Sequence, residues 1–176
     1  LDRGATRIVD ELRGQPELQA ALMVTMAESY NSLEENVAAR DYLETSVPAM
    51  AATLGPDHPE VLELRYLLGL ATLYSGDAAA AKPIHEDNLA RQQAVHGQNS
   101  FEAMRETRQL AAVDATLGNY DAAETGFLLV LDAFRSSGHD DQLTKALLDY
   151  GSMLRRVDRE PEEEALLLEA LANREQ

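Results

Sequence analysis

The apolar residues of the chain recur at the three- and four-residue spacing of an α-helix. One stripe runs from Leu22 to Leu33, and after a break at 34–36 a second steps through Ala39, Leu43 and Val47. A third begins at Val61 and continues through Leu64, Leu68 and Ala71. Strict alternation of apolar and polar residues, which is typical of strands, is absent from the sequence. The pattern therefore predicts an all-α fold built from pairs of helices.

The same pattern returns at a fixed interval of 42 residues, between Gly55 and Gly97 (97 − 55) and between Gly76 and Gly118 (118 − 76). Further series at this spacing are Ala39, Ala81, Ala123; Leu43, His85, Phe127; and Val47, Leu89, Leu131. A fourth repeat unit continues the pattern at slightly shorter spacing, with Tyr150, Gly151, Leu167 and Leu171. Several series at one offset indicate a repeat protein. We predict a single repeat domain over 1–176, a solenoid of helical hairpins, with an N-terminal helix at 1–14 and four repeats at 15–57, 58–98, 99–138 and 139–176.

The segments between the stripes are typical of helix ends. In "LGPDHPEV", Leu54 to Val61, the glycine predicts a helix stop, and either Asp57 or His58 is suited to cap the next helix. The equivalent segment "HGQNSFEA" offers Asn99 and Ser100 instead, and Gly76-Asp77 predicts a turn and cap within a hairpin. We expect Pro48 to kink or end its helix, and Pro83 to cost less because it lies near a helix start.

Composition narrows the kind of core and of partner. Apolar residues make up 45% of the 176 residues, but aromatics only 5% with no Trp, so the core must be built from Leu, Ala, Val and Met. The net charge of −16 repels phosphate backbones, which argues against nucleic-acid binding. There is no Cys and no apolar run near 18 residues, so we expect no disulfide and no insertion into a membrane. The chain starts at Leu1 without a signal-like segment, and we interpret it as a fragment of a longer protein.

Two segments resemble tetratricopeptide repeats: the "Y-x-x-L-x-x-x-x-x-A" pattern of Tyr30 to Ala39, and "LGNYDAA" at Leu117 to Ala123. The 42-residue period and the "LGPDHPEV" joint are similar to the kinesin light chain type of this repeat. The resemblance implies a right-handed superhelical solenoid of antiparallel helix pairs, acting as a non-catalytic protein- or peptide-binding scaffold without a cofactor. The sequence departs from the pattern at four positions: Glu34 replaces a usual Gly, Asn36 and Ala78 a usual aromatic, and Glu163 a usual Ala.

The opening segment, Leu1 to Met23, is similar to the start of the repeat region that follows the kinase domain in many bacterial serine/threonine protein kinases. This similarity implies a signalling protein as the parent, while the Gly-rich loop and H-R-D segment of a kinase are absent from this sequence. It also leaves the compartment open: the cytoplasm by default, or the periplasm if a spanning helix precedes the repeats.

No set of residues in the sequence has the spacing of a catalytic or metal site. His58, His96 and His139 fall at joints about one repeat apart, so they are not expected to converge on one metal ion. Ser-centred elbows, Cys nucleophiles and phosphate-binding loops are also absent. The acidic run "EPEEEA" at 160–165 suits the first turn of a helix. We expect His85 to be a buried neutral imidazole with one hydrogen bond, and we predict no enzymatic activity for this chain.

In tetratricopeptide repeats the first helix of each pair lines a concave groove, and helical phase predicts which side chains face it. The predicted groove residues are Asn31, Tyr66, Leu70, Tyr74, Arg105, Arg108, Gln109, Lys145, Ser152, Arg155 and Arg156. Five of them are basic in an otherwise acidic chain, so the groove is expected to attract the carboxylates of an acidic peptide. Two alternatives stay open. These cations pair instead with the chain's own Glu102, Glu106 and Asp149, or the solenoid self-associates as a homo-oligomer without a peptide ligand.

Overall fold

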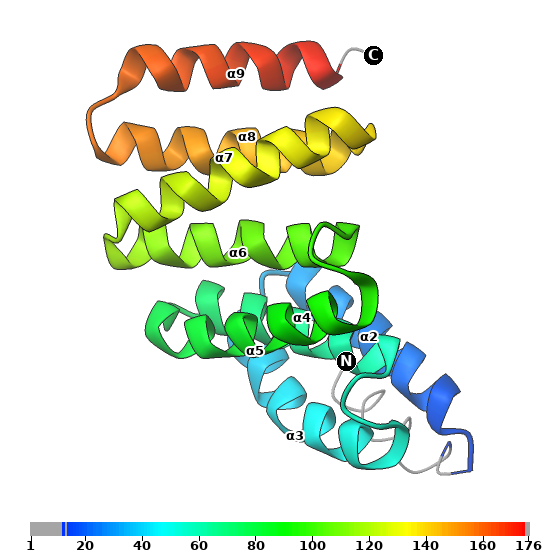
Figure 1. Cartoon of the computed structure of the whole chain (residues 1–176). Coiled ribbons are helices and arrows are strands. Elements are labelled where there is room, and N and C mark those ends of the chain that lie inside the picture. The colour runs from blue at the N-terminus through cyan, green and yellow to red at the C-terminus, as the bar shows by residue number, and fades with distance from the viewer. Residues whose placement is uncertain (1–11, 13, 175–176) are drawn as a thin grey trace. The chain divides into compact units, whose positions relative to one another are not determined.

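The computed structural model describes residue 12 and residues 14–174, and every regular element in this part is an α-helix (Figure 1). The helices are α2 (Pro16–Ser32), α3 (Asn36–Leu54), α4 (Pro59–Tyr74), α5 (Ala78–His96), α6 (Phe101–Leu117), α7 (Tyr120–Ser137), α8 (Asp140–Arg156) and α9 (Glu160–Arg174). The predicted all-α fold of helix pairs is confirmed. The helix predicted at 1–14 lies outside the described residues. Within the described part, no helix is both long enough and apolar enough to cross a bilayer.

The helices form two compact units, one ending at Val95 and the other starting at His96. In the N-terminal unit, α2 packs against α3 and α4, and α3 packs against α4. In the C-terminal unit, α6 packs against α7 and α8, while α8 also contacts α7 and α9 (Figure 1). Each unit therefore holds two successive hairpins, and α9 lies at the end of the second.

Small residues let the paired helices approach closely. Ala27, Gly69, Ala111 and Gly151 are all buried, at the positions where the repeat pattern places a small side chain. Gly69 on α4 accommodates the ring of His85 on α5, which is fully buried. The burial predicted for His85 is thus confirmed.

The turns inside the hairpins use left-handed backbone at corresponding positions. Gly76 (φ 98°) and Gly118 (φ 82°) supply it in the two middle hairpins. Glu34 (φ 59°) and Asp158 (φ 58°) occupy the same place in the outer two. A side chain in this conformation costs roughly 1 kcal/mol or more compared with glycine, so the departure at Glu34 leaves the turn in place at a local cost.

The predicted helix caps form at two joints between hairpins and at one turn within a hairpin. His58 is the N-cap of α4, and its Nδ1 accepts a hydrogen bond from the Glu60 amide at 3.3 Å. The Ser100 hydroxyl accepts one from the Ala103 amide at 3.2 Å, and the Asp77 carboxylate accepts one from the Ala80 amide at 2.9 Å. In the Asp–His pair of the first joint, His58 therefore serves as a helix cap.

Pro48 does not end its helix. The helix α3 continues to Leu54, so of the two outcomes predicted for Pro48, a kink or an end, the end was wrong. The ring of Pro48 is exposed, whereas Val47 and Met50 beside it are buried in the core. Packing of these neighbours outweighs the loss of one backbone hydrogen bond.

Candidate protein-binding surface

The basic residues predicted for the groove lie on α6 and α8, which pack side by side in the C-terminal unit. The two helices carry Arg105, Arg108, Gln109, Lys145, Ser152, Arg155 and Arg156. The structure divides this set into residues that pack between helices and residues that face solvent. The division decides which of them can reach a partner.

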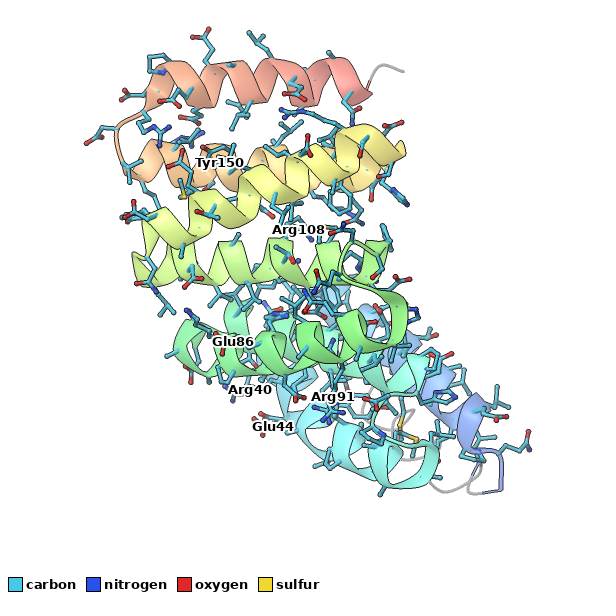
Figure 2. All side chains as sticks on the ribbon, viewed as in Figure 1. Arg40, Glu44, Glu86, Arg91, Arg108 and Tyr150 are labelled. Carbon is cyan, nitrogen blue, oxygen red and sulfur yellow. The ribbon has the colours of Figure 1, made fainter. Side chains whose placement is uncertain are left out.

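Arg108 and Gln109 lie inside the helix packing. Gln109 is 1% exposed, and the Arg108 side chain is 8% exposed. The Arg108 side chain is labelled in Figure 2. Its guanidinium forms a 2.5 Å ion pair with Asp149 on α8, which links the first helices of the third and fourth pairs. Burial raises the pKa of Asp149, and the charges of Arg108 and then Lys145 work against that rise. For Arg108 the first alternative therefore holds: this predicted groove cation pairs with Asp149 of the same chain.

The exposed members of the set lie on α8: Lys145, Ser152, Arg155 and Arg156. Lys145 pairs with Asp141 one turn earlier, at 2.6 Å, and both side chains remain largely in solvent. Among the described residues, the Arg156 guanidinium makes one long contact, 3.5 Å, to the Ala115 carbonyl oxygen of α6. Spacings of seven and four residues place Lys145, Ser152 and Arg156 on one side of the helix. We call these three residues with Arg155 the α8 face.

Arg155 is held by an unusual acidic partner. Its Nε donates to Glu163 of α9 at 2.7 Å, and its other nitrogen also contacts the same oxygen. Glu163 is only 7% exposed although it stands where the repeat pattern has alanine. A Cβ on Gly151 would lie 3.7 Å from the Glu163 Cγ. The sequence pattern marked Glu163 as a departure, but it did not indicate the pairing with Arg155.

Arg105 sits over an aromatic ring at the start of α6. Its guanidinium carbon is 5.8 Å from the centre of the Phe101 ring. The Phe101 ring also stacks on the ring of His139, with the two ring centres 4.7 Å apart. His139 is exposed at the start of α8, and its stacking on Phe101 was not predicted because a contact between two joints leaves no mark on sequence spacing.

The remaining predicted groove residues belong to the N-terminal unit. Asn31 is half-buried, Tyr66 and Leu70 are buried, and Tyr74 is 56% exposed. Tyr66 meets the edge of the buried His85 ring at 6.1 Å. Of these four, Tyr74 offers the most surface to a partner.

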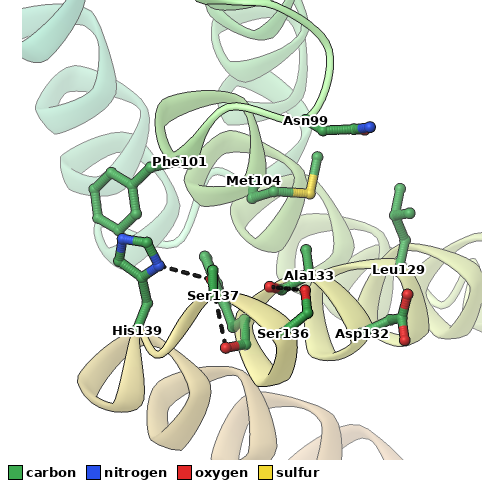
Figure 3. Close-up of a pocket in the computed structure, with 10 residues that line it drawn as sticks. Asn99, Phe101, Met104, Leu129, Asp132, Ala133, Ser136, Ser137 and His139 are labelled. Carbon is green, nitrogen blue, oxygen red and sulfur yellow. Dashed lines mark hydrogen bonds between the residues drawn. The ribbon is translucent and has the colours of Figure 1, made fainter.

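A cavity of about 300 Å³ opens in the C-terminal unit between the start of α6 and the end of α7 (Figure 3). It is lined by Asn99, Phe101, Met104, Leu129, Asp132, Ala133, Phe134, Ser136, Ser137 and His139. His139 Nδ1 and the Ser137 hydroxyl form a 2.7 Å hydrogen bond at its wall. Nothing in the spacing of these residues pointed to a cavity. Across residues 14–174, no group of three or more His, Asp or Glu side chains is arranged to hold a metal ion.

A polar cluster links α7, α8 and the turn before α9. The Tyr150 hydroxyl donates to Glu124 at 2.6 Å, and Arg159 donates to both Glu124 oxygens at 2.9 and 3.0 Å. These donors, Tyr150 first, hold the pKa of Glu124 below its usual value despite its partial burial. Burial and the hydrogen bond to Glu124 raise the pKa of Tyr150 to about 12. The cluster fixes the C-terminal hairpins against each other.

Comparison with known proteins matches residues 18–97 to the tetratricopeptide repeat family. No curated protein matches the sequence well enough to count as a relative. The solved structure of BtubC (BKLC) from P. vanneervenii is similar with a TM-score of 0.77 at 15% identity, over 97% of this chain and 68% of that one. Two structures of nearly identical TPR-like repeats, from a Podosopora anserina protein described as a kinesin light chain, each give a TM-score of 0.55 at 17% identity. They cover 93% of this chain and 95% and 94% of those chains.

Proposed function

Because residues 18–97 are tetratricopeptide repeats and the repeat fold extends through the C-terminal unit, we propose that this protein-interaction scaffold binds an acidic segment of a partner on its α8 face. The repeats are a module for protein–protein interaction, and this type of fold is generally non-catalytic. The positive charges of the α8 face add a preference for one kind of partner, a segment that carries carboxylates. Guanidinium and ammonium ions form charge-assisted hydrogen bonds with carboxylates.

The observation that carries the proposal is the exposure of cations on α8 within a chain of net charge −16. Lys145 is paired with Asp141, but such exposed pairs contribute only about 0–1 kcal/mol. A ligand carboxylate can therefore replace Asp141 at little cost. Arg156 makes a single long contact to a neutral carbonyl oxygen, so an incoming carboxylate gains a charged hydrogen bond there.

Arg108 serves the fold in this proposal. It is buried against Asp149, so reversing its charge would damage the packing of α6 on α8 before it reported on binding. Arg155 is likewise tied to the buried Glu163. Lys145 and Arg156 are the informative positions.

The experiment is a fluorescence titration of the chain with a labelled peptide rich in Asp and Glu, against a peptide of equal length with Asn and Gln instead. The double variant Lys145→Gln/Arg156→Gln should bind the acidic peptide about tenfold more weakly or worse. The control Ala79→Glu/Ala122→Glu changes net charge equally at exposed positions of α5 and α7, and should bind nearly as well as the parent chain.

Binding should also weaken between roughly 0.05 and 0.5 M salt, because exposed charges are screened over this range. Equal losses in both double variants would reject the α8 face, since only net charge would then matter. Light scattering tests the rival proposal of a self-association module: a concentration-dependent dimer that Lys145→Gln/Arg156→Gln leaves intact, without peptide binding, would favour it.

We further propose that the scaffold is part of a bacterial signalling protein such as a serine/threonine kinase, on the similarity of Leu1 to Met23 to the segment that follows such kinase domains. The sequence of the gene upstream of Leu1 tests this. A kinase domain there supports it, and it also decides between cytoplasm and periplasm by the presence of a spanning helix.

A further inference from the structure

The cavity between the start of α6 and the end of α7 lies entirely within the C-terminal unit (Figure 3). Its volume of about 300 Å³ is at the lower end of the range for ligand pockets, roughly 300–1,000 Å³. Met104 and Phe134 line it and are buried, at 3% and 1% exposed. Leu129 lines it as well and is 51% exposed. The apolar lining therefore extends from the core to the surface.

Three exposed polar side chains line the same cavity: Asn99, Asp132 and His139. Among the described residues, the Asn99 amide and the Asp132 carboxylate form no hydrogen bond or ion pair. The His139 ring uses its Nδ1 for the Ser137 hydroxyl, at 2.7 Å, and its Nε2 has no hydrogen-bond partner in this part of the chain. These groups can therefore bind a ligand without breaking a contact within the fold.

The cations around the cavity leave the charge of Asp132 available. Arg135, three residues later on α7, donates two hydrogen bonds of 2.7 Å to Glu169 of α9. The bond to Glu169 raises the pKa of Arg135 most, burial opposes it, and the charge of Asp132 adds the smallest part. Arg105 lies over the Phe101 ring, 5.8 Å from its centre, which disfavours a second cation there. A positive group in the cavity is thus directed to Asp132.

We propose that this cavity binds a lysine or arginine side chain of a partner protein. The charged end pairs with Asp132, and the methylene stem packs on Leu129 and Met104, as such stems do on apolar surfaces. The Asn99 amide can both donate and accept, so it suits the N–H and C=O groups of the peptide backbone that carries the side chain. The net charge of −16 attracts a basic partner over a longer range. This site is separate from the α8 face and selects the opposite charge.

The probe is the peptide acetyl-Gly-Gly-Arg-Gly-Gly-amide, titrated into the intact chain. Binding is followed by the methyl signals of Met104 and Leu129 in nuclear magnetic resonance spectra. A matched peptide carries citrulline, the neutral analogue of arginine, in the central position. The arginine peptide should shift both signals in a saturable way, and the citrulline peptide should bind about tenfold more weakly or worse.

Four variants of the chain, all at exposed positions of α7, locate the contact without unfolding it. Asp132→Asn should bring the two peptides to equal affinity, because one charge of the pair is then missing. Asp121→Asn removes the same charge elsewhere on the helix and should leave the preference for arginine unchanged. Leu129→Ala should weaken the arginine peptide about threefold or more. Leu128→Ala, at a leucine that is also 51% exposed, should not.

Absence of saturable shifts, or a preference for arginine that survives Asp132→Asn, overturns the proposal. The same shifts on concentrating the chain alone also overturn it, because the occupant is then a second copy. Propylguanidinium, the arginine side chain without its backbone, should bind more weakly than the peptide, and equal binding would overturn the assignment to a protein partner. The variant Lys145→Gln/Arg156→Gln should bind the arginine peptide at least as well as the parent chain, which separates this result from that for the α8 face.

Discussion

The imidazole of His85 on α5 occupies the space where Gly69 on α4 would carry a side chain. A Cβ built on Gly69 would lie 2.4 Å from the His85 Nε2 and 2.5 Å from its Cε1. The His85 ring has no exposed surface and meets the edge of Tyr66. In the corresponding positions of the next repeat, Ala111 and Phe127 are buried. Gly69 and His85 are therefore a matched replacement for an alanine and an apolar residue.

Gly69→Ala should destabilise the chain, because the new methyl group and the rigid His85 ring cannot share this space. We expect a loss of about 1–3 kcal/mol in the free energy of unfolding, measured by urea denaturation. Adding His85→Ala to Gly69→Ala should bring the stability closer to that of His85→Ala alone than additivity predicts.

Gly151→Ala is the matched control, since Gly151 holds the same place in the fourth repeat. A Cβ there would meet only the Glu163 Cγ, at an ordinary 3.7 Å. The substitution should be neutral or stabilising by up to about 1 kcal/mol, because alanine favours a helix interior. A similar loss at both positions would show that the His85 contact is not the cause.

The left-handed residues Glu34 and Asp158 give a second prediction. Glu34→Gly and Asp158→Gly should each stabilise the fold by about 0.5–1 kcal/mol, because glycine adopts their φ of 59° and 58° without strain. Thermal unfolding followed by circular dichroism measures this. Gly118→Ala, at the equivalent turn with φ 82°, should show the opposite sign, and a loss of stability in all three variants would contradict the explanation.

The helix pairs, caps and turns were predictable because each depends on local spacing: Asp77, His58 and Ser100 cap where their positions before a stripe indicate. Contacts between distant positions were not. Glu163 departs from the repeat pattern, and only the structure shows that it pairs with Arg155 of α8. Helical phase placed Arg108 and Arg156 together, but it could not tell that one is buried and the other exposed. Phase gives a direction around the helix, and burial depends on the neighbour that lies in that direction.

The Arg108–Asp149 pair joins a buried guanidinium to a carboxylate whose side chain is 34% exposed, so it should behave as a partly buried charge pair. Asp149→Ala leaves the Arg108 guanidinium, 8% exposed, without this carboxylate, and we expect a loss of about 3 kcal/mol in the free energy of unfolding. The double variant Arg108→Met/Asp149→Leu should lose less than the sum of Arg108→Met and Asp149→Leu, because no charge is then stranded.

The exposed pair of Lys145 and Asp141 provides the comparison for that cycle. Lys145→Met should change stability by no more than about 1 kcal/mol, since both partners are largely in solvent. If Asp149→Ala had an effect as small as this, the ion pair would not be what holds α6 against α8.

Tyr150→Phe should change how stability depends on pH. In the folded chain the Tyr150 hydroxyl is the first cause of the lowered pKa of Glu124. A carboxylate with a folded pKa below its unfolded value, near 4.5, stabilises the fold above that pH. This contribution disappears as the pH falls through the folded pKa. In Tyr150→Phe the pKa of Glu124 returns toward its usual value. The variant should thus be about 1–2 kcal/mol less stable at neutral pH, with a smaller difference near pH 3. Urea denaturation across this range measures it, with Tyr120→Phe on α7 as a control.

At high pH the same hydrogen bond acts through the tyrosine: Tyr150, with a pKa of about 12, keeps its proton in the folded chain after the unfolded chain has lost it. The parent chain should therefore lose stability between about pH 10 and 12, more than Tyr150→Phe does. A parallel decline in both proteins, at acid and alkaline pH alike, would contradict the coupling of Tyr150 to Glu124.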